Sequence, residues 1–95
     1  MAEDDWKKAF IASAARAQVA IYFMRCLQLA ELNMLDDAEH YLSGGRWRAS
    51  VDLTGVPPKV VDVTESLCAR ALGLIEYDDP RAVADAIVQI LDLWQ

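Results

Sequence analysis

The sequence predicts an all-α fold: a small bundle of three to four helices, with a long first helix and a long loop at about residues 44–57. Apolar residues recur at intervals of three and four over most of the chain, which is the spacing of one helix face. Glycine and proline gather between these periodic segments, where they form turns. The length of 95 residues suits one domain and is too short for two, so we expect residues 1–95 to form a single helical domain.

The first helix is expected to begin near Asp4 or Asp5 and to end at about Leu32, because neither glycine nor proline interrupts this stretch. One broad apolar face contains Ile11, Ala15, Val19, Tyr22, Phe23, Cys26, Leu27 and Ala30. The flank beyond it is also apolar, and a helix that is apolar nearly all round needs contacts on two sides. We therefore expect a second copy of the chain, or equally a different partner, to cover the outer strip formed by Phe10, Ala14, Ala17, Ile21 and Met24, with Leu32 beyond it.

A short second helix fits the residues from Asp36 to about Ser43. Asp36 and Glu39 have the spacing of a capping box at its start. Gly44 or Gly45 is expected to supply the left-handed residue that ends it. The preceding segment, "LNML", suits either a tight turn or an unbroken helix.

Residues 44–57 are rich in glycine and proline, so they predict a connecting loop in which "SVDLTGV" could form one short extended segment. Helical spacing returns at Pro58, and its shared face contains Val60, Val61, Thr64, Leu67, Cys68, Ala71, Leu72 and Ile75. The β-branched start, "VVDVT", lowers helix propensity. A strand followed by a shorter helix from near Thr64 is therefore the alternative for this segment.

The last helix is expected to begin at Asp79 and Pro80, which fit an N-cap followed by proline at the first helical position. It continues to the end of the sequence. Its core-facing residues are expected to be Val83, Ile87, Ile90, Leu91 and Trp94, so removing the last five residues would remove part of the core.

The composition favours a protein-binding role. The formal net charge is −6, and binding to nucleic acid or anionic lipid requires clustered Lys and Arg. The acidic residues lie mainly at expected helix starts, where capping explains them. Hydrophobic residues make up 55% of the chain, which is more than so small a domain can bury, so we expect another protein to cover part of the surface.

We expect a cytoplasmic protein that does not enter a membrane. Arg16 and Arg25 interrupt the long apolar run of residues 9–30, and an arginine near the bilayer centre costs about 2.5–3.5 kcal/mol. The sequence starts with acidic residues and lacks the basic region of a signal peptide. Cys26 and Cys68 lie in apolar helical patterns and are expected to be free thiols in a reducing compartment.

We expect no catalytic, cofactor or metal site. The two cysteines and the single histidine, His40, lack the spacing of a zinc site, and "SGGR" lacks the full phosphate-binding pattern. A small enzyme using His40 as a general base is the second alternative function, because Asp36 and Asp37 lie four and three residues before it and could orient its ring. No serine or cysteine nucleophile is tied to this histidine, so a non-enzymatic protein is favoured.

A nucleic-acid-related regulator is the first alternative function. The segment "TESLCARALGL" places Ala69 four residues before Gly73, as in the first half of many helix-turn-helix units. The following helix would then read DNA, yet it starts with Asp79 and also carries Asp85, and carboxylates meet phosphates and base edges poorly. An acidic protein could instead imitate DNA and inhibit a DNA-binding protein. An ordinary helical hairpin explains the segment better, so we do not expect nucleic acid as a partner.

The segment Arg46–Trp47–Arg48 is the candidate partner-binding site. Tryptophan and arginine are enriched at binding hot spots, and a glycine-flanked loop would present them. The alternative is that Trp47 folds back onto the core, since an exposed indole is unfavourable in a small protein. We predict that Trp47 folds back while Arg46 and Arg48 stay outside and contact a partner. The sequence thus predicts a small adaptor, inhibitor or accessory subunit that works by protein–protein contact and self-associates.

Overall fold

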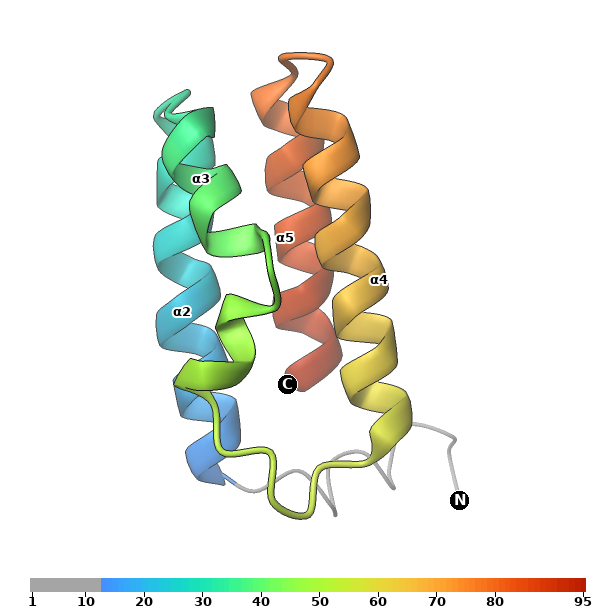
Figure 1. Ribbon diagram of the computed structural model, residues 1–95. Helices are drawn as coiled ribbons and strands as arrows, with labels where there is room; N and C mark the ends of the chain where they lie inside the picture. The colour runs from blue at the N-terminus through green and yellow to red at the C-terminus, as the bar shows by residue number, and fades with distance from the viewer. Residues whose placement is uncertain (1–12) are drawn as a thin grey trace.

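Four α-helices and one 3-10 helix make up most of the computed structural model, which describes residues 13–95 (Figure 1). The predicted all-α bundle is confirmed, and no strand occurs between residues 13 and 95. In chain order the elements are α2 (Ser13–Glu31), α3 (Leu35–Leu42), η1 (Arg46–Ser50), α4 (Pro58–Ile75) and α5 (Pro80–Trp94). The predicted start of the first helix, and Phe10 with it, lie outside the described residues.

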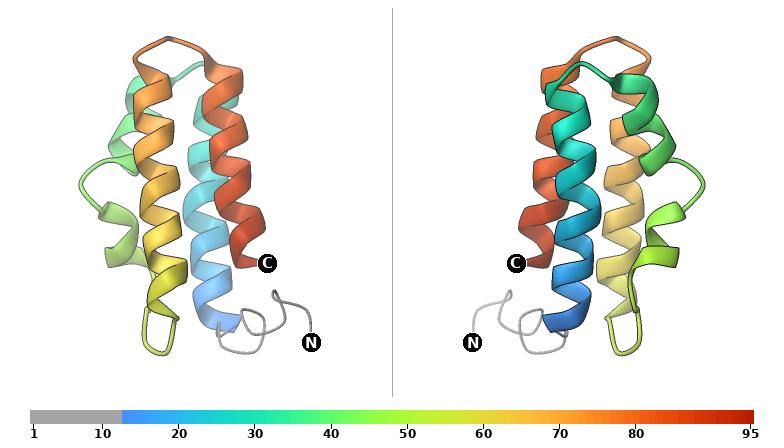
Figure 2. Two further views of the ribbon diagram at one scale, coloured as in Figure 1. Left: turned by 90° about the vertical axis from the view of Figure 1, so that its right-hand side faces the viewer. Right: turned by 90° about the vertical axis from the view of Figure 1, so that its left-hand side faces the viewer.

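The three long helices form three corners of the bundle, and two short elements share the fourth. α5 packs between α4 and α2, while α3 packs against both α2 and α4 on the other side. η1 continues downward from α3 and also contacts α2 (Figures 1 and 2). α2 and α4 run in one direction and α5 runs in the other, so α4 and α5 form an antiparallel hairpin.

The core follows the apolar spacing of each helix. The face predicted for the first helix is confirmed over the described residues, where Ala15, Val19, Phe23, Cys26 and Ala30 are buried. Ile11, which was predicted to belong to this face, lies outside them. On α4 the buried residues are Val60, Thr64, Cys68 and Ala71, and on α5 they are Val83, Ala86, Ile87, Ile90 and Trp94. The core-facing position of Trp94 confirms that the last residues of α5 belong to the core.

A turn separates the first two described helices, which decides between the two interpretations of "LNML". Asn33 adopts a left-handed conformation with φ of 60°, and the Met34 N–H donates to the Leu29 carbonyl at 2.8 Å. The next helix begins at Leu35, and Met34 at its N-cap makes no side-chain cap. The capping box predicted for Asp36 and Glu39 is therefore wrong, because Asp36 already lies inside the first turn of α3.

The predicted connecting loop contains a 3-10 helix that sequence reasoning missed. Gly44 and Gly45 both have left-handed backbones, with φ of 67° and 65°, as expected for the residues that end α3. The two glycines lead directly into η1, while "SVDLTGV" forms no strand. α4 begins at Pro58, so the alternative of a strand before Thr64 is not observed and the β-branched start is helical.

Side-chain hydrogen bonds cap the start of α5 and join its end to α4. The Asp79 carboxylate accepts a hydrogen bond from the Ala82 N–H at 3.2 Å, which confirms the predicted N-cap of α5. At the other end of that helix, the Trp94 indole N–H donates to the Thr64 hydroxyl at 2.8 Å. This hydroxyl in turn donates to the Val60 carbonyl at 2.7 Å. Both side chains are buried, so the contact sets the register of α5 against α4.

Thr64→Val should lower the free energy of unfolding by about 1–3 kcal/mol, because the shape of the side chain is kept while the Trp94 N–H loses its acceptor in the core. Urea unfolding followed by far-UV circular dichroism measures the change. Ser66→Ala, which removes a hydroxyl from an exposed position of the same helix, is the control and should stay within about 0.5 kcal/mol of the parent. Equal effects of the two variants would contradict the structural role of this bond.

Candidate protein-interaction surfaces

Trp47 folds into the core, as predicted. Gly45, in a left-handed conformation, is the N-cap of η1. The Trp47 side chain points from η1 into the core, and only 1% of Trp47 is exposed. Its ring lies 6.1 Å from the ring of Phe23 and 5.9 Å from that of Trp94, measured between centroids. A residue from the connecting loop therefore joins α2 to α5.

An aromatic cluster extends from this indole toward α3. The Tyr22 ring makes edge-to-face contacts with Phe23 and with Tyr41, with ring centroids 5.1 Å and 5.2 Å apart. The Tyr22 hydroxyl donates a hydrogen bond to the Tyr41 carbonyl. Burial raises the pKa of Tyr22 to about 12, and the charge of Arg46 acts weakly in the opposite direction. Edge-on aromatic pairs add stability beyond area burial, so this cluster fixes α3 and η1 on α2.

The two arginines of the candidate partner-binding site remain on the surface. Arg46 and Arg48 are exposed, and Arg48 Nε forms an ion pair with the Glu65 carboxylate of α4. Both partners of that pair are partly exposed, so it contributes at most about 1 kcal/mol. Trp47 is too deeply buried to contact a partner, which leaves Arg46 and Arg48 as the surface residues of the predicted site. Partner binding by these arginines stays a prediction.

Sequence reasoning did not identify the contacts that hold the loop after η1. The Gln18 side chain of α2 accepts a hydrogen bond from the Asp52 N–H at 2.7 Å. The Asp52 carboxylate accepts one from the Thr54 N–H at 3.0 Å, and its hydrogen bonds to Thr54 lower its pKa. Gln18 and Asp52 are 34 residues apart, so local spacing carries no signal of this contact.

The predicted self-association strip lies on the side of α2 that faces away from the core. Ile21 is 71% exposed and Met24 is 47% exposed. Ala17 is exposed one turn before Ile21, and Ala14 is exposed two turns before it, so the four residues alternate at spacings of three and four. Among the described residues of the strip, none is covered by another element of the bundle. Leu32, just past the helix end, is also 70% exposed.

The described part of α2 is not acidic, although the whole chain is. Its charged residues are Arg16, Arg25 and Glu31, a net charge of +1, whereas the full chain carries −6. The acidic residues after it are spread over α3, the loops, α4 and α5. The strip is therefore an apolar surface on the least acidic α-helix among residues 13–95.

His40 is the histidine that the second alternative function would use as a general base. It is exposed on α3, and its ring packs edge-on beside that of Tyr41 at 6.3 Å. Cys26 and Cys68 are free and buried, and burial raises the pKa of each thiol to about 12. Within residues 13–95, no three His, Cys, Asp or Glu side chains are grouped so that they could hold a metal ion.

The two C-terminal helices lie side by side as an antiparallel hairpin (Figure 2). The helices of a helix-turn-helix unit instead cross at about 90–120°. A tight turn of residues 76–79 joins the pair, in which Asp78 has a left-handed backbone with φ of 53°. Of the helices between Ser13 and Gln95, none has the length and apolar character needed to span a membrane.

The chain matches no protein-family model, and no curated protein and no solved structure shows significant similarity to it. The surfaces and cavities of the molecule are therefore the features that point to a function.

Trp47→Ala should lower the free energy of unfolding by about 3–5 kcal/mol, because a fully buried indole is lost and the chain cannot refill its space. Urea unfolding measures the loss. Arg46→Ala, in the neighbouring exposed position, should change the value by less than about 0.5 kcal/mol. A tolerated Trp47→Ala would show that the indole does not support the core.

The two thiols should be unreactive in the folded protein and should make it less stable in alkali. Unfolded thiols lose their protons near pH 9.0, whereas Cys26 and Cys68 keep them until about pH 12. Between these values the unfolded chain binds fewer protons, so the free energy of unfolding falls as pH rises. Urea unfolding at about pH 8 and about pH 10.5 measures this fall in the free energy of unfolding.

A thiol reagent at about pH 8 should modify the native protein at least about tenfold more slowly than the unfolded chain.

Proposed function

We propose that the protein is a non-enzymatic helical protein–protein interaction module that self-associates through the outer strip of α2. One observation carries the proposal: Ile21 and Met24 are large apolar side chains that stay largely exposed on a helix whose opposite face forms the core. Exposed apolar residues that line up on one element are typical of association surfaces. An adaptor, an inhibitor or an accessory subunit would use such a surface in a reducing cytoplasm.

The spacing of the strip supports helix-to-helix pairing. Ala14, Ala17, Ile21 and Met24 alternate at three and four residues, which is the a/d spacing of a coiled-coil seam. The two alanines allow close approach of a second helix, and the larger pair can insert between its side chains. Phe10 continues the same spacing in the sequence before the described residues.

A second copy is the occupant that the charges favour. Two chains with a net charge of −6 repel each other, so they associate best where acidic residues are few. α2 meets this condition, with a net charge of +1 over Ser13–Glu31. In a twofold dimer the same patch of both chains meets itself. An apolar strip with few charges can do this without placing like charges against each other.

The size of the strip sets the expected affinity of self-association. A helix of 19 residues is about 28 Å long, and its outer face covers less than the roughly 800 Å² per partner of a standard interface. Self-association is therefore expected to be weak and to depend on concentration. Arg46 and Arg48 then remain on the surface, where an acidic surface of a different protein would contact Arg46 directly and would compete with Glu65 for Arg48.

Ile21→Glu combined with Met24→Glu should abolish self-association, because two carboxylates would be buried at the centre of the seam. Size-exclusion chromatography with light scattering, run over a concentration series, measures the molar mass. The matched control is Val63→Glu combined with Val88→Glu, which adds the same charge at exposed apolar positions of α4 and α5.

The parent and the control are expected to shift from monomer to dimer as concentration rises, while the strip variant stays monomeric. A monomeric parent at every concentration would overturn self-association. Dimers that form equally in all three proteins would overturn the assignment of the interface to α2.

A further inference from the structure

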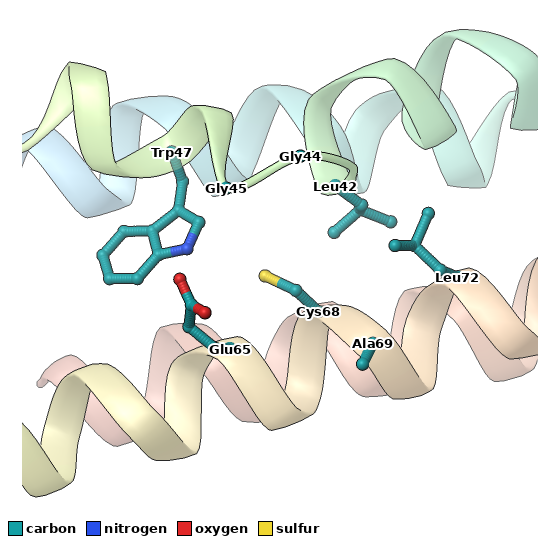
Figure 3. Close-up of a pocket in the computed structure, with 8 residues that line it drawn as sticks. All are labelled: Leu42, Gly44, Gly45, Trp47, Glu65, Cys68, Ala69 and Leu72. Carbon is teal, nitrogen blue, oxygen red and sulfur yellow. The ribbon is translucent and has the colours of Figure 1, made fainter.

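A small cavity lies beside Trp47, between the end of α3, η1 and α4. Its volume is about 150 Å³, and its walls are mostly apolar. Leu42, Cys68, Ala69 and Leu72 line it together with the Trp47 indole, and Glu65 lies at its edge (Figure 3). Ala69 and Glu65 are at least partly exposed, so the cavity opens to solvent along α4.

The cavity contains an unused hydrogen-bond donor. Only 1% of Trp47 is exposed, and its buried Nε1–H has no hydrogen-bond partner in the protein. Figure 3 shows the indole nitrogen turned toward the Cys68 sulfur, above the Glu65 carboxylate. An unpaired buried N–H costs about 1–3 kcal/mol, so native proteins rarely leave one without a partner. The second core indole, Trp94, does have its partner in Thr64.

A hydroxyl group matches the two polar groups at this place. One oxygen of the Glu65 carboxylate pairs with Arg48 Nε at the edge of the cavity. A hydroxyl oxygen can accept from the Trp47 N–H while its hydrogen is donated to this carboxylate. A single water could do the same, but it would leave the space between Leu42, Ala69 and Leu72 unfilled. An apolar engineered cavity of about this volume holds benzene, which sets the size of the body that fits.

We propose that this cavity binds a small apolar molecule with one hydroxyl group, of the size of phenol, with its oxygen on Trp47 Nε1 and its apolar body against Leu42, Ala69 and Leu72. The thiol of Cys68 contributes to the apolar wall and takes no part in chemistry. This site is separate from the outer strip of α2, so it does not depend on self-association.

The indole N–H signals in a ¹⁵N–¹H correlation spectrum test the site directly. Adding phenol should shift the Trp47 indole signal with saturation, at a Kd of roughly 1 mM or weaker as expected for so small a ligand. The Trp94 indole signal is the internal control, because its N–H is already bonded to Thr64, and it should move much less. Benzene, which lacks the hydroxyl, should bind roughly tenfold more weakly.

Three variants on α4 complete the test. Ala69→Leu fills the cavity from an exposed position and should remove the saturable shift, while Ser66→Leu places the same side chain on the exposed surface outside the cavity and should leave it unchanged. Glu65→Gln should weaken phenol binding by roughly tenfold without changing benzene binding. An unchanged Trp94 signal shows that each variant remains folded.

No saturable movement of the Trp47 signal with either compound would overturn the site and leave a water as its only occupant. Equal affinities for phenol and benzene would overturn recognition of the hydroxyl. Phenol binding that survives Ala69→Leu would place the compound elsewhere.

Discussion

The burial of Trp47 is the contact on which the rest of the bundle depends. Three long helices leave a fourth corner open, and α3, with eight residues, is too short to close it. η1 completes the corner by placing one large indole between Phe23 of α2 and Trp94 of α5. A small domain has few residues with which to build a core, so one side chain of this size ties segments far apart in the sequence.

Much of this fold could be predicted from the sequence, because local rules decide most of it. The N-cap at Asp79, the start at Pro58 and the buried face of the first helix all follow from side-chain spacing and from the chemistry of capping. The capping box at Asp36 failed because the left-handed Asn33 ends the preceding helix earlier and allows α3 to start at Leu35. The turn at Asn33 determined that start, and the spacing of Asp36 and Glu39 did not.

The candidate sites also differ in whether they could be predicted from the sequence. Exposure of the outer strip could be predicted, since residues opposite a core face on one helix must point outward. The cavity beside Trp47 could not be predicted, because Leu42, Trp47, Glu65 and Leu72 come from three separate elements. Their proximity depends on how α3 and η1 settle against α4, and no spacing along the chain records that arrangement. The predicted arginine–tryptophan–arginine site is split by the fold into one core residue and two surface residues.

Both sharp turns at one end of the bundle rely on a residue other than glycine in a left-handed backbone. Asn33 joins α2 to α3 and Asp78 joins α4 to α5, and Figure 1 shows both connections at the same end. Asparagine and aspartate tolerate this conformation better than other residues with a side chain, yet glycine adopts it without steric penalty. Glycine at either position would remove this steric penalty, so the two reversals are places where a single substitution is expected to raise the thermal stability of the bundle.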